Sequence, residues 1–126
     1  MKNKESKENI KYNLLQLENK VCVITGAASI RSIGYGTAEL FAAHGAKLVI
    51  LDLAMYKQIA SQLTDNIETQ IGKKTEIICL QCDIRSSSEC DMAIEKAVEH
   101  FGTIDCLVNC AGIVKSEGML SITEQD

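Results

Sequence analysis

The sequence contains no proline and no tryptophan, and only 4% of its 126 residues are aromatic. It also has no apolar run approaching the roughly 20 residues that a membrane-spanning helix needs. Neither sign of charge dominates, because 13 Lys and Arg residues stand against 17 Asp and Glu residues, for a net charge of −4. A basic patch of the kind that marks nucleic-acid binding is therefore not expected. We expect neither a membrane nor a nucleic-acid partner.

The start of the chain lacks the features of an exported protein. Residues 1–8 are mostly charged and no apolar segment follows them, unlike a secretory signal peptide, and their glutamates suit a transit peptide poorly. The remaining composition, 46% hydrophobic and 24% charged, is typical of a soluble globular domain. We therefore expect a cytoplasmic protein with a polar arm over residues 1–17 and one domain over residues 18–126.

The six cysteines suggest a metal site or a disulfide only at first sight. Cys79 and Cys82 are separated by two residues, but residues 75–82 are predicted to be a strand, in which positions three apart point to opposite faces. Cys106 and Cys110 would lie roughly 13 Å apart in an extended chain, too far for a disulfide. We expect buried, reduced thiols that act as small apolar side chains, and neither a zinc site nor a disulfide framework.

Short apolar runs alternate with helical patterns along the domain. Strands are predicted at residues 20–25, 46–52, 75–82 and 104–109, and helices at 33–44, 55–71 and 86–101. This alternation predicts an α/β fold with a doubly wound, Rossmann-like parallel sheet in the strand order 3-2-1-4. We expect the chain to form only part of such a sheet, because the fourth strand would be an edge and the helix predicted to start near Ser121 is not completed.

Each predicted helix has an apolar face and a recognisable end. For the first helix we expect Ile33, Thr37, Leu40 and Phe41 to share the buried face, with Gly45 ending the helix. The second is predicted to bury a stripe at a spacing of four residues that starts at Met55. The third is predicted to begin with a capping box at residues 86–89 and to bury Cys90, Ala93, Ile94, Ala97, Val98 and Phe101.

The loop after the first strand, residues 25–38, is rich in small residues. Such residues let backbone amides approach a pyrophosphate, and the N-terminus of the following helix favours its negative charge. The loop departs from the G-x-G-x-x-G pattern, because Glu39 stands where the last glycine should be, and the Gly-Lys-Ser/Thr of a Walker loop is missing. Taken alone, this loop is compatible with a nucleotide site and with a plain glycine-rich turn.

Asp52 adds weight to the nucleotide site. It ends the second strand, 26 residues after Gly26, where a carboxylate can accept hydrogen bonds from both ribose hydroxyls of an adenosine. The same charge repels a 2′-phosphate, and Leu53 supplies no cation to offset it, which favours NAD over NADP. Arg31, a cation in the loop, favours NADP, and we give Asp52 the greater weight. The alternative role for Asp52 is a helix N-cap at the next turn.

Four segments in order resemble the short-chain dehydrogenase/reductase family across residues 18–126. They are Thr25-Gly26, Asp52, Cys82-Asp83-Ile84 and the run Phe101-Gly-Thr-Ile-Asp-Cys-Leu-Val-Asn-Cys-Ala-Gly112. The resemblance implies that Asp83 accepts from the adenine amino group and that Ile84 flanks the ring. It also implies that Asn109, Ala111 and Gly112 line the ribose. The predicted cofactor-binding residues are Gly26, Ser29, Arg31, Ser32, Ile33, Asp52, Leu53, Asp83, Ile84, Asn109, Ala111 and Gly112.

The sequence departs from the common family pattern at two points. Cys110 replaces the second Asn of Asn-Asn-Ala-Gly, and two residues are added to the glycine loop, where Ser32 takes the place of a glycine. The lengthened loop looks like that of enoyl-acyl-carrier-protein reductases, a divergent branch of the same family. Residues 109–112 are more similar to the main branch, so the loop alone does not make the protein an enoyl reductase.

Catalysis in the family that this sequence resembles depends on a Tyr-x-x-x-Lys pair with a serine. The lysine ammonium group lowers the pKa of the tyrosine phenol, so that the phenol can exchange a proton as hydride moves. Tyr12, Tyr35 and Tyr56 are followed four residues on by Gln, Glu and Ala, so none fits. The resemblance therefore implies the cofactor-binding half of an NAD-dependent oxidoreductase acting on an alcohol/ketone pair, inactive alone. With later segments it would act on a small-molecule substrate, which the sequence leaves open together with homo-oligomerisation. The alternatives are a non-catalytic dinucleotide-binding or interaction module and an enoyl-thioester reductase.

Overall fold

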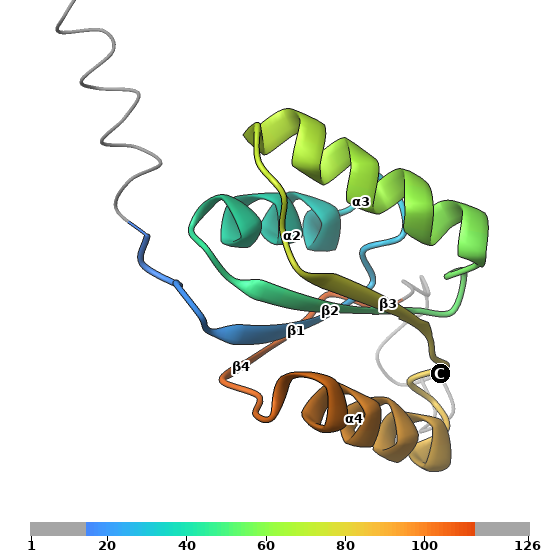
Figure 1. Ribbon diagram of the computed structural model, residues 1–126. Coiled ribbons are helices and arrows are strands. Elements are labelled where there is room, and N and C mark those ends of the chain that lie inside the picture. The colour runs from blue at the N-terminus through green and yellow to red at the C-terminus, as the bar shows by residue number, and fades with distance from the viewer. Residues whose placement is uncertain (1–14, 113–126) are drawn as a thin grey trace, which may run out of the picture.

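The computed structural model describes residues 15–112, which form a parallel four-stranded sheet in the order β3-β2-β1-β4 (Figure 1). The expected fold class and strand order are confirmed. In chain order the elements are β1 (Val21–Thr25), α2 (Ile33–Ala43), β2 (Lys47–Asp52), α3 (Lys57–Ile71), β3 (Ile77–Gln81), α4 (Ser87–Phe101) and β4 (Cys106–Asn109).

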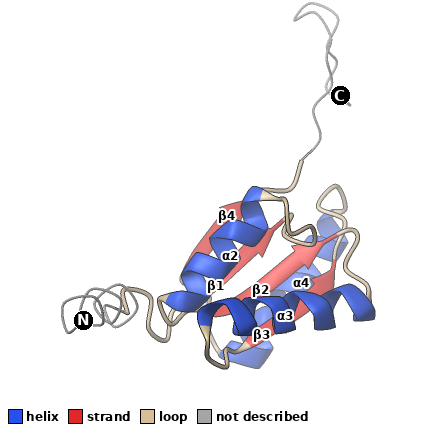
Figure 2. Cartoon of the chain, turned by 90° about the horizontal axis from the view of Figure 1, so that it is seen from above, coloured by secondary structure: helices blue, strands red, loops and turns tan. Residues whose placement is uncertain are grey.

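Helices cover both faces of the sheet. Figures 1 and 2 show α2 and α3 side by side on one face and α4 on the other. All five residues of β1 are buried, because alternate side chains serve two cores. Cys22 and Ile24 pack toward α2 and α3, whereas Val21 and Val23 pack toward α4. This arrangement explains why the central strands are continuously apolar rather than alternating.

The expected buried face of α2 was wrong for Ile33 and Leu40, whereas Phe41 is half-buried and packs against the core as expected. Ile33 and Leu40 are 81% and 54% exposed, and the helix instead buries Gly34, Ala38 and Ala42 against the sheet. Small residues allow the helix backbone to lie close to β1 and β2. Tyr35 is buried together with them, whereas Ile33 and Leu40 face solvent. Helix α2 therefore packs on the sheet through its small residues and Tyr35.

The other two helices follow their patterns more closely. The stripe on α3 is confirmed, with Leu63 and Ile67 buried and Met55 buried just before the helix begins. Helix α4 begins as expected, because the Ser86 hydroxyl accepts a hydrogen bond from the Glu89 amide at 3.3 Å. Its buried face is narrower than expected, however. Ala93 and Ala97 are buried, whereas Ile94 and Val98 remain exposed.

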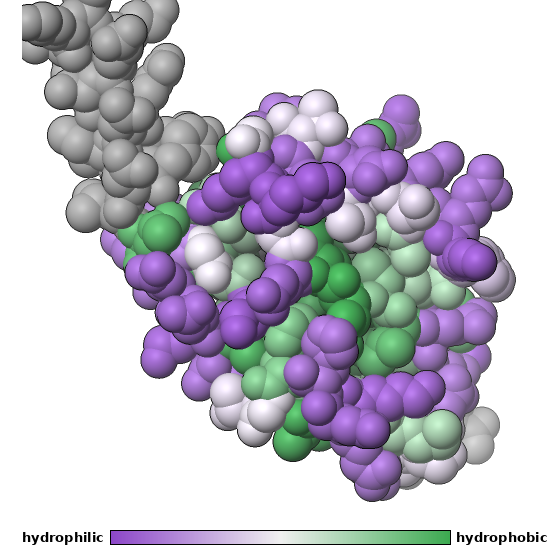
Figure 3. Space-filling model, viewed as in Figure 1, coloured by the Kyte–Doolittle hydropathy of each residue, from purple (hydrophilic) through white to green (hydrophobic). Residues whose placement is uncertain are grey.

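Both outer strands leave apolar surface uncovered in the part of the chain that the structure describes. On β4, Leu107 is 55% exposed, and Cys106 and Val108 are half-buried. Figure 3 shows the corresponding apolar surface over β3, between the hydrophilic outer surfaces of α3 and α4. No helix among residues 15–112 is long and apolar enough to cross a bilayer. The helix expected near Ser121 and most of the N-terminal arm lie outside the described residues.

Candidate functional site

The glycine loop between β1 and α2 is held by two close backbone approaches. Gly26 has a φ of 77°, and a Cβ there would lie 2.6 Å from Ala111 Cα in the turn after β4. A Cβ on Gly34 would lie 2.5 Å from the carbonyl oxygen of Gly26. Both contacts are too short for any side chain. The loop therefore follows a tight path that leaves no space for a side chain at either glycine, even though its sequence departs from the usual glycine pattern.

Ser32 forms the N-cap of α2 and organises the lengthened part of the loop. Its hydroxyl accepts from the Tyr35 amide at 3.0 Å and donates to the Ser29 carbonyl at 2.6 Å. The added residues, Ile30 and Arg31, are exposed. The insertion thus bulges outward, and the start of the helix keeps a capped, electropositive end.

The carboxylate of Asp52 connects two turns at the end of β2. One oxygen accepts from the Ala28 amide and the other from the Ala54 amide, both at 2.9 Å. The N-cap of α3 is Tyr56, so the alternative role of Asp52 as that helix N-cap was wrong. Each carboxylate oxygen has room for a second hydrogen bond, and Asp52 can accept from a ligand while holding both turns.

Thr25, which belongs to the segments that carry the resemblance but not to the predicted cofactor-binding residues, fixes the turn after β4. Its hydroxyl oxygen is 3.1 Å from the amide nitrogens of both Cys110 and Ala111, which donate to it, and the residue is 4% exposed. A single polar residue at the end of an otherwise apolar strand was the signal that could have identified it. Thr25 joins the β1 loop to the residues expected to line the ribose.

Asp83 follows β3 and forms a two-pronged ion pair with Arg85. The guanidinium Nη2 lies 2.9 Å from one carboxylate oxygen, and Nε lies 3.0 Å from the other. These hydrogen bonds lower the pKa of the Asp83 carboxyl below its usual value and raise that of Arg85. The Asp83 amide in turn donates to the Glu89 carboxylate at 3.2 Å, which ties this turn to α4.

A cavity of about 460 Å³ collects these features at the carboxyl ends of the strands. All but three of the predicted cofactor-binding residues line it; Arg31, Ile33 and Asn109 do not. Leu51, Cys82, Arg85 and Cys110 line it in addition. The full lining is Gly26, Ser29, Ser32, Leu51, Asp52, Leu53, Cys82, Asp83, Ile84, Arg85, Cys110, Ala111 and Gly112.

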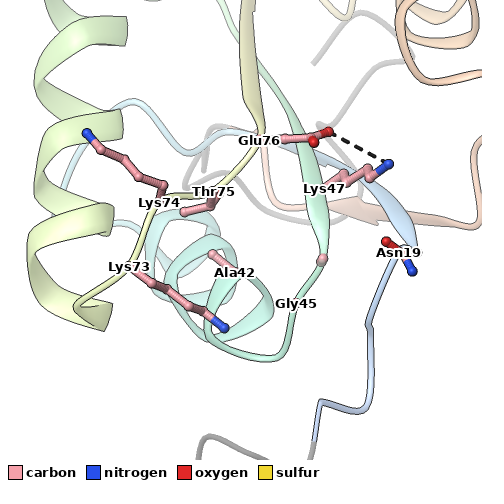
Figure 4. Close-up of a pocket in the computed structure, with 9 residues that line it drawn as sticks. Asn19, Ala42, Gly45, Lys47, Lys73, Lys74, Thr75 and Glu76 are labelled. Carbon is pink, nitrogen blue, oxygen red and sulfur yellow. Dashed lines mark ion pairs between the residues drawn. The ribbon is translucent and has the colours of Figure 1, made fainter.

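A second cavity, of about 370 Å³, lies at the opposite end of the sheet, where α2 and α3 finish (Figure 4). Its cations have protein partners. Lys47 pairs with Glu76 at 3.7 Å, and Lys73 Nζ donates to the Ala43 carbonyl at 3.2 Å. Lysines near helix C-termini compensate the negative end of the helix dipole, which accounts for their presence here.

Cys79 and Cys82 lie on opposite faces of the sheet, as the sequence predicted. Cys79 packs against the core on the α2 and α3 face, and Cys82 packs on the α4 face. Burial raises the pKa of both thiols, and of Cys22, to about 11. A thiol with so high a pKa is a poor nucleophile at neutral pH. These three cysteines are therefore structural residues.

Comparison with known proteins finds a matching family model, similar relatives and similar solved structures. Residues 26–126 match the family model described as "Enoyl-(Acyl carrier protein) reductase". An uncharacterized short-chain type dehydrogenase/reductase of Sinorhizobium fredii is 36% identical over 115 residues, which cover 87% of this chain and 42% of that protein. Galactitol 2-dehydrogenase of Agrobacterium fabrum is 37% identical over 111 residues, covering 88% and 40% of the two chains.

Solved structures show the same similarity. A short chain dehydrogenase from Mycobacterium smegmatis superimposes with a TM-score of 0.71 at 29% identity, covering 86% of this chain and 43% of that one. A hydroxysteroid dehydrogenase from Escherichia coli gives a TM-score of 0.64 at 33% identity, covering 77% and 38%. The chain thus spans less than half the length of these relatives.

Proposed function

Because the chain belongs to the short-chain dehydrogenase/reductase family, we propose that the cavity at the carboxyl ends of its strands binds NAD, and that the protein is an oxidoreductase acting on an alcohol/ketone pair. The family as a whole binds nicotinamide dinucleotides. The choice of NAD and the substrate class are the proposal. When bound, the nicotinamide supplies the hydride-transfer chemistry, and the described residues bind and orient the rest of the molecule.

The position of Asp52 is the observation that carries the preference for NAD. Its two carboxylate oxygens each hold one amide at 2.9 Å and each keep a further acceptor position within the lining of the cavity. The two hydroxyls of an adenosine ribose match those two positions, whereas a 2′-phosphate would meet the carboxylate charge. Leu53, the next residue in the lining, is apolar, and the cavity's arginine is paired with Asp83.

The glycine loop supports a pyrophosphate beside that ribose. Gly26 brings the loop backbone against the turn after β4, and Ser32 caps α2 so that the start of the helix faces the loop. A helix N-terminus offers unpaired amides and a partial positive charge to an anion. The lining therefore combines an acceptor for a ribose with donors for phosphates, as a dinucleotide requires.

The alcohol/ketone substrate is supported by the relatives. Galactitol 2-dehydrogenase and the hydroxysteroid dehydrogenase are named for substrates that carry hydroxyl groups. The second candidate is an enoyl-thioester reductase, which the description of the matching family model and the lengthened loop favour. Reduction of a 2-enoyl thioester but not of a 3-oxo thioester by the whole protein would support this second candidate.

Calorimetric titration with NAD and NADP tests the cofactor assignment. We expect the wild-type chain to bind NAD more tightly than NADP. Asp52→Asn should weaken NAD binding by about 10- to 100-fold, because hydrogen bonds to a charged acceptor are lost. The ratio of the NAD affinity to the NADP affinity should fall as well. Asp91→Asn, an exposed acid on α4 outside the cavity lining, is the matched control.

The assignment fails if the wild-type chain binds the two nucleotides equally, or if Asp52→Asn leaves the preference unchanged. Circular dichroism of both variants checks that the fold persists, since Asp52 also holds the Ala28 and Ala54 amides. Binding of NAD without turnover of any alcohol or ketone by the whole protein would favour the non-catalytic binding module instead.

A further inference from the structure

Arg85 is a cation at the cavity that the expected cofactor-binding residues do not include. We propose that Arg85 is a positioning residue for adenine: its guanidinium orients the Asp83 carboxylate so that one free acceptor position recognises the exocyclic amino group of a 6-aminopurine. This inference rests on the proposed dinucleotide function. The resemblance already implies that Asp83 accepts from the adenine amino group, and the new element is that its orientation depends on Arg85, a residue that need not touch the base.

The geometry of the pair leaves Asp83 little freedom. One carboxylate oxygen, Oδ1, accepts from the Arg85 amide and from Nε, both at 3.0 Å, while Oδ2 accepts from Nη2 at 2.9 Å. A guanidinium bound by two parallel hydrogen bonds fixes the plane of a carboxylate as well as its position. Arg85 therefore determines how the Asp83 side chain is presented at the cavity.

Counting acceptor positions identifies the atom that remains available. A carboxylate has about four lone-pair positions, two on each oxygen. Three are used by Arg85, both of those on Oδ1 and one on Oδ2. No other residue in the described range of 15–112 donates to this side chain. One position on Oδ2 is left for a ligand.

The charge of the pair keeps that position an acceptor. The hydrogen bonds from Arg85 lower the pKa of the Asp83 carboxyl, so the group stays ionised at neutral pH. An ionised carboxylate can only accept, which suits the amino group at position 6 of adenine and opposes the carbonyl oxygen at position 6 of hypoxanthine. Ile84, the residue after Asp83, also lines the cavity, and its exposed apolar side chain can cover the face of a purine.

The test compares NAD with its hypoxanthine analogue, nicotinamide hypoxanthine dinucleotide, by calorimetry. We expect the wild-type chain to favour NAD by about 10-fold or more, as one hydrogen bond to a charged acceptor allows. Arg85→Ala should weaken NAD binding by about 3- to 10-fold, with a smaller effect on the analogue. In that variant only the backbone amide of residue 85 still holds Asp83, through Oδ1, so ordering the carboxylate on binding costs more entropy. Arg85→Lys keeps the charge without the fork and should fall between the two.

Arg85 can be replaced without disturbing the fold, since its side chain is 80% exposed. The unfolding midpoint of Arg85→Ala should therefore stay close to that of the wild type. Lys96→Ala, an exposed cation on α4 outside the cavity lining, is the control and should keep the wild-type ratio of affinities.

The possible outcomes distinguish a failure of the role of Arg85 from a failure of the proposed dinucleotide binding. If the wild-type chain binds NAD but does not distinguish the analogue, or if Arg85→Ala keeps the wild-type ratio, the role of Arg85 is overturned while the dinucleotide function stands. If the folded wild-type chain binds neither dinucleotide, the proposed function fails and the inference fails with it. A ratio that falls in Arg85→Ala, with Arg85→Lys between, supports the inference.

Discussion

The two ends of the sheet hold cavities of similar volume, about 460 Å³ at the carboxyl ends of the strands and about 370 Å³ at the amino ends. Helices start at the first and finish at the second, so their dipoles make opposite contributions. At the carboxyl end, Asp52 and Asp83 retain acceptor positions after their internal hydrogen bonds are counted. At the amino end, Lys47 and Lys73 are paired with Glu76 and the Ala43 carbonyl.

This difference shows that cavity volume does not identify a site. The amino-end cavity is a gap between finished helices whose charges compensate those helix ends, and its cations are used locally. The carboxyl-end cavity is built from turns that pack on one another by backbone contact and leave polar groups for a ligand. Substitutions at the carboxyl end should therefore affect folding and binding together, whereas those at the amino end should affect stability slightly and binding not at all.

Gly34→Ala should have the largest effect. Its Cβ would lie 2.5 Å from the Gly26 carbonyl oxygen and 2.9 Å from the carbonyl carbon, and neither backbone atom can move without shifting the glycine loop. We expect a loss of about 3 kcal/mol or more in the free energy of unfolding, together with weaker NAD binding. Urea unfolding followed by circular dichroism measures the first, and calorimetry measures the second.

Gly36→Ala, two residues along the same helix, is the matched control. Nothing lies within 4 Å of the Cβ it would add. Replacing a glycine inside a helix by alanine should raise stability by roughly 0.5–1 kcal/mol. Equal effects of the two substitutions would contradict the close approach of α2 to the loop.

Gly72→Ala tests the amino end of the sheet. A Cβ there would meet open space, but the φ of 73° is unfavourable for alanine, so we expect the free energy of unfolding to fall by about 1 kcal/mol.

Thr25→Val should have the next largest effect. Valine has nearly the same shape but leaves the Ala111 amide without its acceptor, whereas the Cys110 amide still donates to the backbone carbonyl of residue 25 at 3.2 Å. An unsatisfied buried donor costs roughly 1–3 kcal/mol, and we expect a total loss of about 2 kcal/mol, because part of the turn can reach water. Thr25→Ser keeps the hydroxyl and should lose less than half as much. A Thr25→Val variant as stable as the serine variant would show that the turn does not depend on this oxygen.

Much of this site could be predicted because its residues stand at the ends of predicted strands. Asp52 and Asp83 each end a strand or follow one directly, and the carboxyl ends of parallel strands meet at one edge. The strand order followed from the continuous burial of the apolar runs and from the handedness of crossovers. These features depend on local pattern, which a single sequence carries.

The remaining features depend on contacts between distant segments. The Thr25 hydroxyl binds amides 85 and 86 residues away, and no local pattern announces such a pairing. The buried face of α2 was mispredicted for a related reason. Periodicity counts Ile33 and Leu40 as apolar, but the depth at which a helix sits depends on which side chains are small enough to let it approach. The close approach of the helix at its small residues, which periodicity does not register, decided which apolar side chains are buried.

Lys73→Met should have the smallest effect, and it tests the amino end directly. The methionine keeps an unbranched apolar stem but loses the ammonium that donates to the Ala43 carbonyl beside the C-terminus of α2. Such an interaction contributes about 0.3–1 kcal/mol, so a loss of about 0.5 kcal/mol is expected in urea unfolding, with Lys73→Arg restoring most of it.

The NAD affinity of Lys73→Met should equal that of the wild type, because the two cavities share no lining residue. One result would contradict this comparison of the two ends. Millimolar phosphate would stabilise the wild-type chain against unfolding, and Lys73→Met would abolish that stabilisation. That result would mean that the cations of the amino-end cavity serve a ligand rather than the helix ends. Without it, the opposite directions of the helix dipoles are sufficient to explain why, within residues 15–112, we propose a binding site at the carboxyl end of the sheet and not at the amino end.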